Sequence, residues 1–353
     1  MIKWTKLEDC CEILDYKRIP VAASQRRKGP YPYYGANGVQ DYVDDYIFND
    51  DLVLLAEDGG NFGSKNKPIA YRVSGKCWVN NHAHVLKPKM GIDIDYLCYS
   101  LAYYNVDNLI NGATRKKLTQ NAMRQLKIPV LPLNIQKRIV NKIQNIEKII
   151  NLRKKEINQL NYLIKARFVE MFGDPVINNK NIKNQKLGDV CFLKAGEFTS
   201  SKTISPVKTS INKYPCFGGN GIRGYVNNYT HQGNYSLIGR QGALCGNVKF
   251  ATGKFRNTEH AILASPKIEI NSRWLFELLN LEKLNRFKSG AAQPGLAVKT
   301  LNEVTIPVAD LKLQNEFANF VQQVDKSKFE NIVYLNKTLS SKILSQIGDV
   351  IRD

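Results

Sequence analysis

Residues 134–175 carry a narrow apolar stripe with the spacing of one long helix. The apolar positions recur at alternating intervals of four and three, interrupted only at Arg153: Ile139, Ile143, Ile146, Ile150, Ile157, Leu160 and Ile164. This heptad spacing predicts an amphipathic helix that packs against a second helix. Gly173 and Pro175 end it, because glycine favours a left-handed helix cap and proline cannot continue a helix. At 1.5 Å per residue the predicted helix is a rod of roughly 50 Å.

A second stripe near the other end of the chain offers a partner. Subtracting 178 from its residue numbers brings its first three positions onto Ile139, Ile143 and Ile146, and Lys328 interrupts the match further along. The stripe consists of Phe317, Val321, Val324, Ile332, Leu335, Leu339 and Ile343. Since the first helix leads into the second half of the chain, the second helix must return along the first for both stripes to be covered. We therefore expect the two helices to pack antiparallel as a coiled coil.

The two stripes belong to a repeat with a period of about 180 residues. Residues 31–46 and 214–229 are identical at eight of sixteen positions. LLAEDGGNFGS from Leu54 aligns with LIGRQGALCGN from Leu237, and NNHAHVLKPK from Asn80 aligns with NTEHAILASPK from Asn257. We interpret the chain as a duplicated unit, in which a globule is followed by a long helix. The expected boundaries are 1–133 and 134–175 for the first copy, and 176–311 and 312–353 for the second.

Each globule is predicted to mix strands and helices. Short apolar runs bounded by Gly, Pro and Asn predict strands at 52–56, 70–73 and 85–86, and helices are expected near 96–108 and 274–286. The expected fold class is α+β, with two similar globules joined by two long antiparallel coiled-coil helices. Such a molecule would have an internal pseudo-two-fold repeat.

The charge of the chain favours a polyanionic partner. Lys and Arg number 51 and Asp and Glu 31, which gives a formal net charge of +20. Nucleic acid is preferred over an anionic membrane, because no run of 18 apolar residues occurs and MIKWTKLEDCC lacks the apolar core of a signal peptide. We therefore expect a cytoplasmic protein. The seven cysteines form an odd set without CxxC, which argues against a disulfide framework and a zinc ribbon.

Catalytic motifs of the common nucleic-acid enzymes are missing from the sequence. No GxxxxGK[ST] phosphate loop occurs, no GxGxxG is found that leads from a strand into a helix, and the tetrapeptide of amino-methyltransferases is also lacking. His82 and His84 could suggest a metal pair, but they fit alternate positions of a strand better, so no metal site is expected. Asp58 could suggest a catalytic acid, yet the second copy has Gln241 there. Variable loops on a constant frame indicate binding rather than catalysis.

The ordered set of motifs resembles a known family. Ile128-Pro129-Val130 followed by QKRIV, the long helix ending in FVEMFGDP, NNHAHVLKP and LIGRQGALCGNV are together similar to the specificity subunit of type I restriction-modification systems. The resemblance implies two target-recognition domains, each reading half of a bipartite DNA sequence, separated by helices that act as a ruler. It also implies a chain without catalytic activity. Expected partners are two methyltransferase subunits that bind S-adenosylmethionine, and restriction/translocase subunits that use ATP and Mg.

The geometry agrees with a gapped DNA target, because two basic globules on a rod of roughly 50 Å can reach sites more than one helical turn of about 34 Å apart. DNA-contact candidates lie on the charged or variable loops, and a solvated surface charge is the alternative for each. They are Arg26, Arg27, Lys28, Asn61, Ser64, Lys65, Lys67, Arg115, Lys116, Lys117, Lys202, Arg223, Arg240, Gln241, Arg256 and Gln293. Arg240 and Gln241 are preferred, since a glycine-flanked turn can approach a groove. Asn37 and Asn220 precede glycines and fit turn chemistry better than recognition.

Two other functions remain open at this stage. One is a coiled-coil scaffold whose globules bind proteins rather than DNA, which the charge of +20 and the loop variation argue against. The other is a self-contained nuclease or methyltransferase with an unfamiliar site, which the missing motifs argue against. Selection of a gapped motif from random DNA would distinguish a specificity subunit from both.

Overall fold

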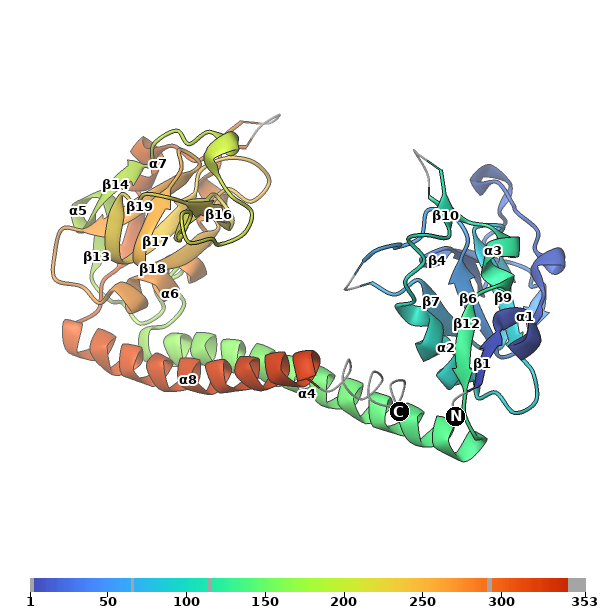
Figure 1. Ribbon diagram of the computed structural model, residues 1–353. Coiled ribbons are helices and arrows are strands. Elements are labelled where there is room, and N and C mark those ends of the chain that lie inside the picture. Colours follow the sequence, from blue (N-terminus) through green and yellow to red (C-terminus); the bar gives the residue numbers. More distant parts are fainter. Residues whose placement is uncertain (1–2, 65–66, 113–115, 291–293, 342–353) are drawn as a thin grey trace. The chain divides into compact units, whose positions relative to one another are not determined.

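The computed structural model describes residues 3–64, 67–112, 116–290 and 294–341, with side chains described as far as Tyr334. The chain divides into two compact units. The first consists of residues 1–152 with 335–353, and the second of residues 153–334. In Figure 1 the sheets of the first unit are blue to cyan, and those of the second are yellow to orange.

The first unit is built on two four-stranded sheets. One has the order β2-β9-β6-β7 and is antiparallel throughout; the other has the order β4-β3-β8-β5, in which β3 and β8 run parallel. Their strands are β2 (Cys11–Ile13), β3 (Tyr31–Gly35), β4 (Gly38–Val43), β5 (Phe48–Asn49), β6 (Leu52–Ala56), β7 (Ala70–Val73), β8 (Lys76–Val79) and β9 (Ala83–Pro88). Two further pairs are formed by β1 (Lys3–Lys6) with β12 (Lys127–Val130), and by β10 (Ile110–Asn111) with β11 (Lys117–Leu118).

Strand β6 separates two apolar cores. All five of its residues are fully buried, because β9 and β7 flank it and both of its faces are covered. Successive side chains alternate between the faces. Val53 and Leu55 therefore join the core under helix α2 (Ile94–Ala102), while Leu52 and Leu54 join the core beneath β8. The predicted strands at 52–56, 70–73 and 85–86 are confirmed, and the helix expected at 96–108 is α2.

The second unit repeats this topology as one sheet. Its order is β14-β19-β17-β18-β15-β16, and β15 and β18 run parallel as β3 and β8 do. The strands are β14 (Cys191–Ala195), β15 (Tyr214–Gly218), β16 (Gly221–Val226), β17 (His231–Gly239), β18 (Val248–Asn257) and β19 (Ala261–Pro266), with β13 (Asn184–Lys186) and β20 (Thr305–Pro307) as a separate pair. Strand β18 corresponds to β7 and β8 together. The long strands of the second unit continue through Gly233 and Gly253, which lie opposite one another, whereas the first unit breaks the corresponding strand at Ser74 and Gly75.

Short helices complete both units. In the first they are α1 (Leu7–Cys10), α2, α3 (Gln120–Arg124) and the 3-10 turns η1 (Asp15–Lys17) and η2 (Ala23–Gln25). In the second they are α5 (Leu187–Val190), α6 (Ser272–Leu281), α7 (Val298–Asn302), η3 (Ser201–Thr203) and η4 (Leu284–Phe287). Helix α6 is the one expected at 274–286. Asp93 and Asn271 cap α2 and α6 by accepting hydrogen bonds from main-chain N–H groups of the first turn.

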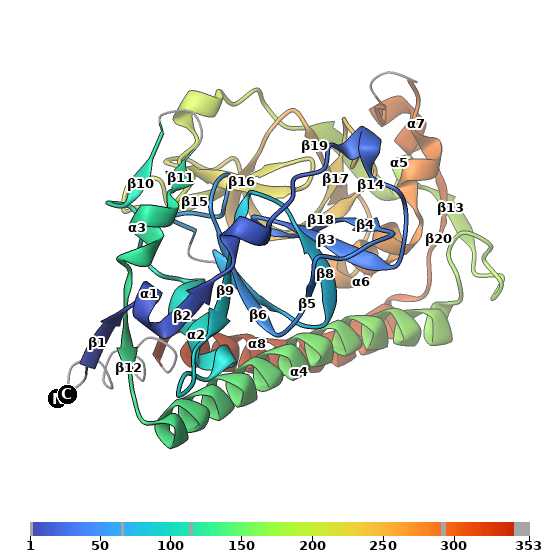
Figure 2. The ribbon, with the colours of Figure 1, turned by 90° about the vertical axis from the view of Figure 1, so that its right-hand side faces the viewer.

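The first long helix is confirmed as α4 (Leu133–Phe172), and Gly173 follows it with a φ of 78°. Strand β12 leads directly into its start (Figure 2). The second long helix is α8, described over Leu311–Ser341. In the second unit, the ring centroids of Phe168 and Phe172 lie 5.4 and 5.7 Å from that of Phe317. Arg153 lies earlier in α4 than Phe168, and its Nη1 donates to Oδ1 of Asn331 in α8 over 3.0 Å.

Most residues of the predicted stripes avoid solvent, with one clear exception. Ile150, Ile164, Phe317, Val321 and Val324 are buried. Ile139, Ile143, Ile146, Ile157 and Leu160 are half-buried. Ile332 is 44% exposed, beyond the position where Lys328 interrupts the stripe. The side chains of Leu335 and Leu339, and Ile343 altogether, lie outside the described residues.

A buried glutamine ties the start of each long helix to its globule. Gln136 Oε1 accepts from the Asp93 N–H over 2.8 Å, and its Nε2 donates to the carbonyls of Leu131 and Gly91. Gln314 Oε1 likewise accepts from the Asn271 N–H over 2.8 Å, and its Nε2 donates to the Ala309 carbonyl. The repeat therefore extends to individual hydrogen bonds.

Candidate functional site

Three loops meet at one edge of the first unit. The turn between β3 and β4 contacts the turn after β6, because Asn37 Nδ2 donates to the Gly59 carbonyl over 3.0 Å. The segment entering β11 joins them, since Gly59 N–H donates to the Lys116 carbonyl over 3.3 Å. We call this surface loop face 1 and define it by Asn37, residues 57–61 and residues 116–117.

The equivalent loops meet in the second unit. Asn247 Nδ2 donates to Asn220 Oδ1 over 3.2 Å, which joins the turn after β17 to the turn between β15 and β16. Gln241 pairs with Gly295, which brings in the segment before α7. We define loop face 2 by Asn220, residues 240–247 and Gly295.

The aligned glycines of the two turns have a physical reason to recur. Gly59 and Gly242 have φ values of 63° and 83°, and Gly63 and Gly246 have 75° and 86°, which is the left-handed region that favours glycine. At Gly246 a Cβ atom would also lie 2.4 Å from the main-chain nitrogen of Asn285. The glycines therefore hold the frame constant while the side chains between them differ.

Arg240 has the properties of a ligand-binding side chain. Its main-chain N–H donates to the His260 carbonyl over 2.9 Å, and its carbonyl accepts from Leu296 N–H over 2.8 Å, so its backbone is fixed. The residue is half-buried, and its guanidinium makes no hydrogen bond or ion pair with any residue that the structure describes. The neighbouring Gln241 Oε1 instead lies 2.9 Å from His260 Nδ1. A fixed backbone that carries an unsatisfied guanidinium suits recognition of an external acceptor.

Several predicted residues already have partners within the chain. Arg26 Nη1 lies 3.3 Å from Asp41, and its guanidinium covers the Tyr33 ring at 4.2 Å. Arg256 donates to Glu197 over 3.0 Å and to Thr199 over 3.1 Å. These contacts fix both arginines in the fold.

Two polar candidates act within their own loop. Asn61 Nδ2 donates to the Pro68 carbonyl, and Ser64 Oγ accepts from Lys67 N–H. Both hydrogen bonds shape the loop that follows residues 57–61. The side chain of Lys67 is exposed.

Other candidates lie away from the loop faces or outside the described residues. Arg27 and Lys28 are exposed beside the far end of β4, where Asp44 N–H donates to the Arg27 carbonyl over 3.1 Å. Lys202 is exposed in η3, and Arg223 is exposed on β16. Lys65, Arg115 and Gln293 lie outside the described residues. The structure therefore unites the candidates around residues 57–61 with Lys116 and Lys117, but not with Arg27 or Lys28.

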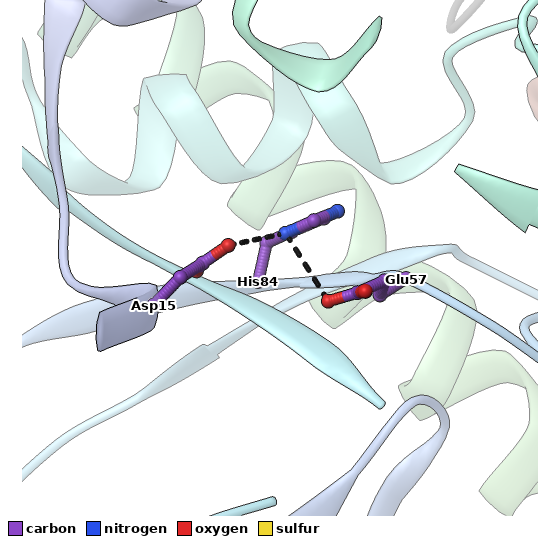
Figure 3. A group of neighbouring side chains, drawn as sticks. All are labelled: Asp15, Glu57 and His84. Atoms are coloured by element: carbon purple, nitrogen blue, oxygen red, sulfur yellow. Dashed lines mark hydrogen bonds and ion pairs between the residues drawn. The ribbon is translucent and has the colours of Figure 1, made fainter. Parts of the chain in front are cut away.

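An ionic cluster extends from loop face 1 into the protein, and Figure 3 draws three of its residues, Asp15, Glu57 and His84. His84 Nδ1 lies 2.6 Å from Asp15 Oδ2 and 3.6 Å from Glu57 Oε2. Arg18 Nη1 donates to Glu57 over 2.6 Å, and Arg18 Nη2 lies 3.3 Å from Asp15. Lys117 Nζ lies 3.0 Å from the other Glu57 oxygen. Sequence reasoning missed Asp15 and Arg18, because no motif marks them and they meet His84 only through strand packing.

The protonation of the cluster follows from its contacts. Burial alone would raise the pKa of Asp15, but hydrogen bonds from His84 and Gln120 hold it below its ordinary value. Burial likewise opposes ionisation of Glu57, while Arg18 and Lys117 keep its pKa low. His84 Nε2 lies 2.9 Å from the Leu118 carbonyl, so the ring faces an acceptor at each nitrogen.

The cluster is better suited to internal ion pairs than to a metal ion. Asp15, Glu57 and His84 bring potential ligand atoms within 4.8 Å of one another. However, Arg18 and Lys117 already form ion pairs with the carboxylates, and the two ring nitrogens of His84 already contact Asp15 and the Leu118 carbonyl. His82 does not join them, because its Nδ1 lies 2.5 Å from Asp58 instead.

A family model described as "Type I restriction modification DNA specificity domain" matches residues 1–162 and, a second time, residues 179–340. The chain belongs to this family. The two matches confirm the internal repeat. The family assigns this specificity chain a role in DNA sequence selection, which does not support the protein-binding scaffold.

Curated relatives carry the same designation. The chain is 44% identical to the type I restriction enzyme EcoprrI specificity subunit of Escherichia coli over 143 residues, which are 40% of this chain and 36% of that one. It is 26% identical to a putative type I restriction enzyme specificity subunit of Haemophilus influenzae over 92% of this chain and 88% of that one. Both relatives are named as specificity subunits of type I restriction enzymes.

Solved structures share the fold. A type I restriction-modification S subunit from M. genitalium covers 96% of this chain and 93% of its own, with a TM-score of 0.58 and 16% identity. At this identity the likeness speaks for the fold alone. Among the described residues, no helix has the length and apolar character needed to span a membrane.

Proposed function

We propose that each globule reads one half of a bipartite DNA target through its loop face. The proposal rests on one observation. The two loop faces share the same main-chain hydrogen bonds but present different side chains. Glu57 N–H donates to the His82 carbonyl as Arg240 N–H donates to the His260 carbonyl, so Glu57 and Arg240 occupy equivalent places. Two faces with one frame and different donors and acceptors suit two different half-sites.

The cations of the globules supply the sequence-independent part of binding. A formal charge of +20 favours phosphate contacts whose affinity falls steeply as salt rises. We assign this role to the remaining lysine and arginine candidates. They are Arg27, Lys28, Lys65, Lys67, Arg115, Lys116, Lys202 and Arg223. Base reading is assigned to Arg240, Gln241, Lys117 and Gln293.

The long helices act as a spacer in this proposal. Residues 1–133 and 176–311 are the target-recognition domains, and helices 134–175 and 312–353 form an antiparallel coiled coil with a pseudo-two-fold relation. The contacts in the second unit support the antiparallel direction, because Phe168 meets Phe317 whereas the earlier Arg153 meets the later Asn331. A pair of packed helices resists bending and so fixes a distance.

We infer that the partners are two methyltransferase subunits docked on the helices, together with restriction/translocase subunits. S-adenosylmethionine, ATP and Mg belong to those subunits, and the assembly is cytoplasmic. A solved structure whose title names complex assembly of the type I R-M system covers 96% of this chain with a TM-score of 0.56. This likeness supports a fold that takes part in such an assembly.

Selection from random-sequence DNA tests the proposed function. The full chain is incubated with the pool, with and without its cognate methyltransferase subunit, and the bound DNA is sequenced. We expect two short fixed blocks separated by a spacer of constant length and free sequence. Recovery of one uninterrupted block, or of no motif in either condition, would remove the proposal.

A further inference from the structure

Each loop face carries a cation beside the same main-chain hydrogen bond, but the cation comes from a different segment in each face. In loop face 1, Leu118 N–H donates to the Glu57 carbonyl over 2.7 Å. In loop face 2, Leu296 N–H donates to the Arg240 carbonyl over 2.8 Å. The residues before these two leucines, Lys117 and Gly295, are therefore equivalent. The first face pairs Glu57 with Lys117, and the second pairs Arg240 with Gly295.

Glu57 holds Lys117, the cation of loop face 1, through an ion pair. Its carboxylate is nearly buried, while the side chain of Lys117 is 48% exposed, so the ammonium lies at the surface and is anchored from beneath. Arg18 holds the second Glu57 oxygen and also donates to the Ala83 carbonyl over 2.8 Å. The anchor of Lys117 is therefore itself immobile.

The rest of the cluster holds the segment that carries Lys117. His84 Nε2 lies 2.9 Å from the Leu118 carbonyl, one residue beyond Lys117. Gln120 Nε2 donates to Asp15 over 2.9 Å, two residues further along. Asp15 also accepts from the Val85 N–H over 2.8 Å, which ties it to the strand of His84. The cluster thus contacts the Glu57 turn and residues 117–120 as well as strand β9.

The second repeat forms the same frame without the cluster. The strand registers place Ala195 where the first repeat has Asp15, and Ile262 where it has His84. Val298 follows Leu296 as Gln120 follows Leu118. Buried ionic groups are commonly no more stabilising than apolar residues of similar volume. A role in placing a surface group explains the cluster better than a role in folding.

We propose that the buried cluster of Asp15, Arg18, Glu57 and His84 is the positioning element of loop face 1, holding Lys117 as the first repeat's counterpart of Arg240. The inference rests on the proposed function, because it assigns these residues to reading the first half-site. The cluster residues do not touch DNA in this account. They act through Lys117 and the turn at residues 57–60.

Removing the anchor and removing the cation have different signatures. Glu57→Gln frees Lys117 and removes one negative charge. We therefore expect the affinity for non-specific DNA and its salt dependence to increase, while discrimination at the first half-site falls about tenfold. Lys117→Gln is expected to lower both the affinity for non-specific DNA and the discrimination at the first half-site. A purely structural role of Glu57 would instead lower non-specific and specific binding together. His84→Gln is expected to follow Glu57→Gln in discrimination without the increase in non-specific affinity.

The experiment measures DNA binding and methylation by the full chain assembled with its methyltransferase subunit, for the wild type, Glu57→Gln, His84→Gln and Lys117→Gln. Arg72→Gln is the control, because it removes ion pairs with Asp51 and Asp95 in the same unit, away from the loop face. Thermal unfolding of each variant identifies loss of the fold. The expected result is relaxed selection in the first half-site, an unchanged second half-site, and no effect of the control.

The contrary results are separable. Equal loss in both half-sites, or an unchanged first half-site in Glu57→Gln and His84→Gln, would overturn the positioning role and leave the proposed function intact. Binding of Mn²⁺ or Zn²⁺ to the wild-type chain that His84→Gln abolishes would overturn it in favour of a metal site. A wild-type complex that selects no two-part motif would remove the proposed function, and the inference with it.

Discussion

At the scale of single residues, Arg240 differs from the other cations of the second globule, because its backbone is fixed while its guanidinium has no partner among the described residues. We predict that Arg240→Ala weakens the contact of the second globule with its half-site. If the guanidinium reads a base, discrimination there falls by about 1–3 kcal/mol. If it contacts phosphate, all sequences weaken evenly and the salt slope falls by about one. Competition binding at several salt concentrations distinguishes the two.

Lys213→Ala is the matched control for Arg240→Ala. It removes a cation from the same globule, beside Tyr214 and outside loop face 2. An equal effect of the two substitutions on the second half-site would contradict a special role for Arg240.

The ionised carboxylates of the cluster predict a pH dependence of stability. The pKa values of Asp15 and Glu57 are lowered on folding, despite their burial, by His84 for Asp15 and by Arg18 and Lys117 for Glu57. The unfolded chain therefore binds protons more tightly at these groups. Their stabilisation is fully present above about pH 5 and is lost as pH falls through the lower folded values.

Urea unfolding at neutral and acidic pH tests this dependence. Asp15→Asn is expected to lower the free energy of unfolding at pH 7 and to make its loss towards acid shallower than in the wild type. An Asp15→Asn chain with the wild-type slope would show that Asp15 is not one of the titrating groups. Since other carboxylates also titrate, the comparison between the two chains is the informative quantity.

At the scale of elements, the buried glutamines attach each long helix to its globule. Gln136→Leu leaves the Asp93 N–H and two carbonyls without their partner. We expect the free energy of unfolding of the full chain to fall by about 1–3 kcal/mol. Gln144→Leu, at an exposed position of the same helix, is the control and should change little. Equal effects in urea unfolding would contradict the attachment.

The elements themselves were largely predictable, because apolar periodicity is a local property. The stripe of α4, the fully apolar β6 and the glycines with positive φ all leave a signal within a few residues. The alignment of the second copy was less secure. Asn80 N–H donates to the Tyr34 carbonyl as Thr258 N–H donates to the Phe217 carbonyl, so Asn80 corresponds to Thr258 rather than to Asn257. An alignment that matches Asn80 with Asn257, because both are asparagine, is therefore one residue out of register at this point.

The ionic cluster could not be predicted, because its contacts cross long separations. Asp15 and His84 are 69 residues apart and meet only because η1 follows β2, which pairs with β9. No residue spacing encodes which strand neighbours which. Arg26 and Arg256 are a second instance, since sequence reasoning could not foresee that Asp41 and Glu197 would lie beside them.

At the scale of the whole molecule, the spacer role predicts a defined response to helix length. Adding one heptad to both α4 and α8 preserves the stripes and lengthens the rod by about 10 Å. That is about three base pairs at roughly 3.4 Å each. We expect the gap of the selected motif to lengthen accordingly while both half-sites stay the same.

Adding the heptad to only one helix is the control, because it shifts one stripe past the other and should abolish selection of a fixed gap. A changed half-site sequence in the doubly extended chain would mean that the helices do more than set a distance. An unchanged gap would mean that they do not set it.

The central claim is that two globules of one chain read two separate DNA half-sites at a fixed distance. Sequencing of methylated positions in DNA modified by the full chain with its methyltransferase subunit measures this directly. The account predicts one motif of two conserved blocks separated by a constant number of unspecified base pairs. A single continuous motif, or two blocks at variable separation, would contradict it.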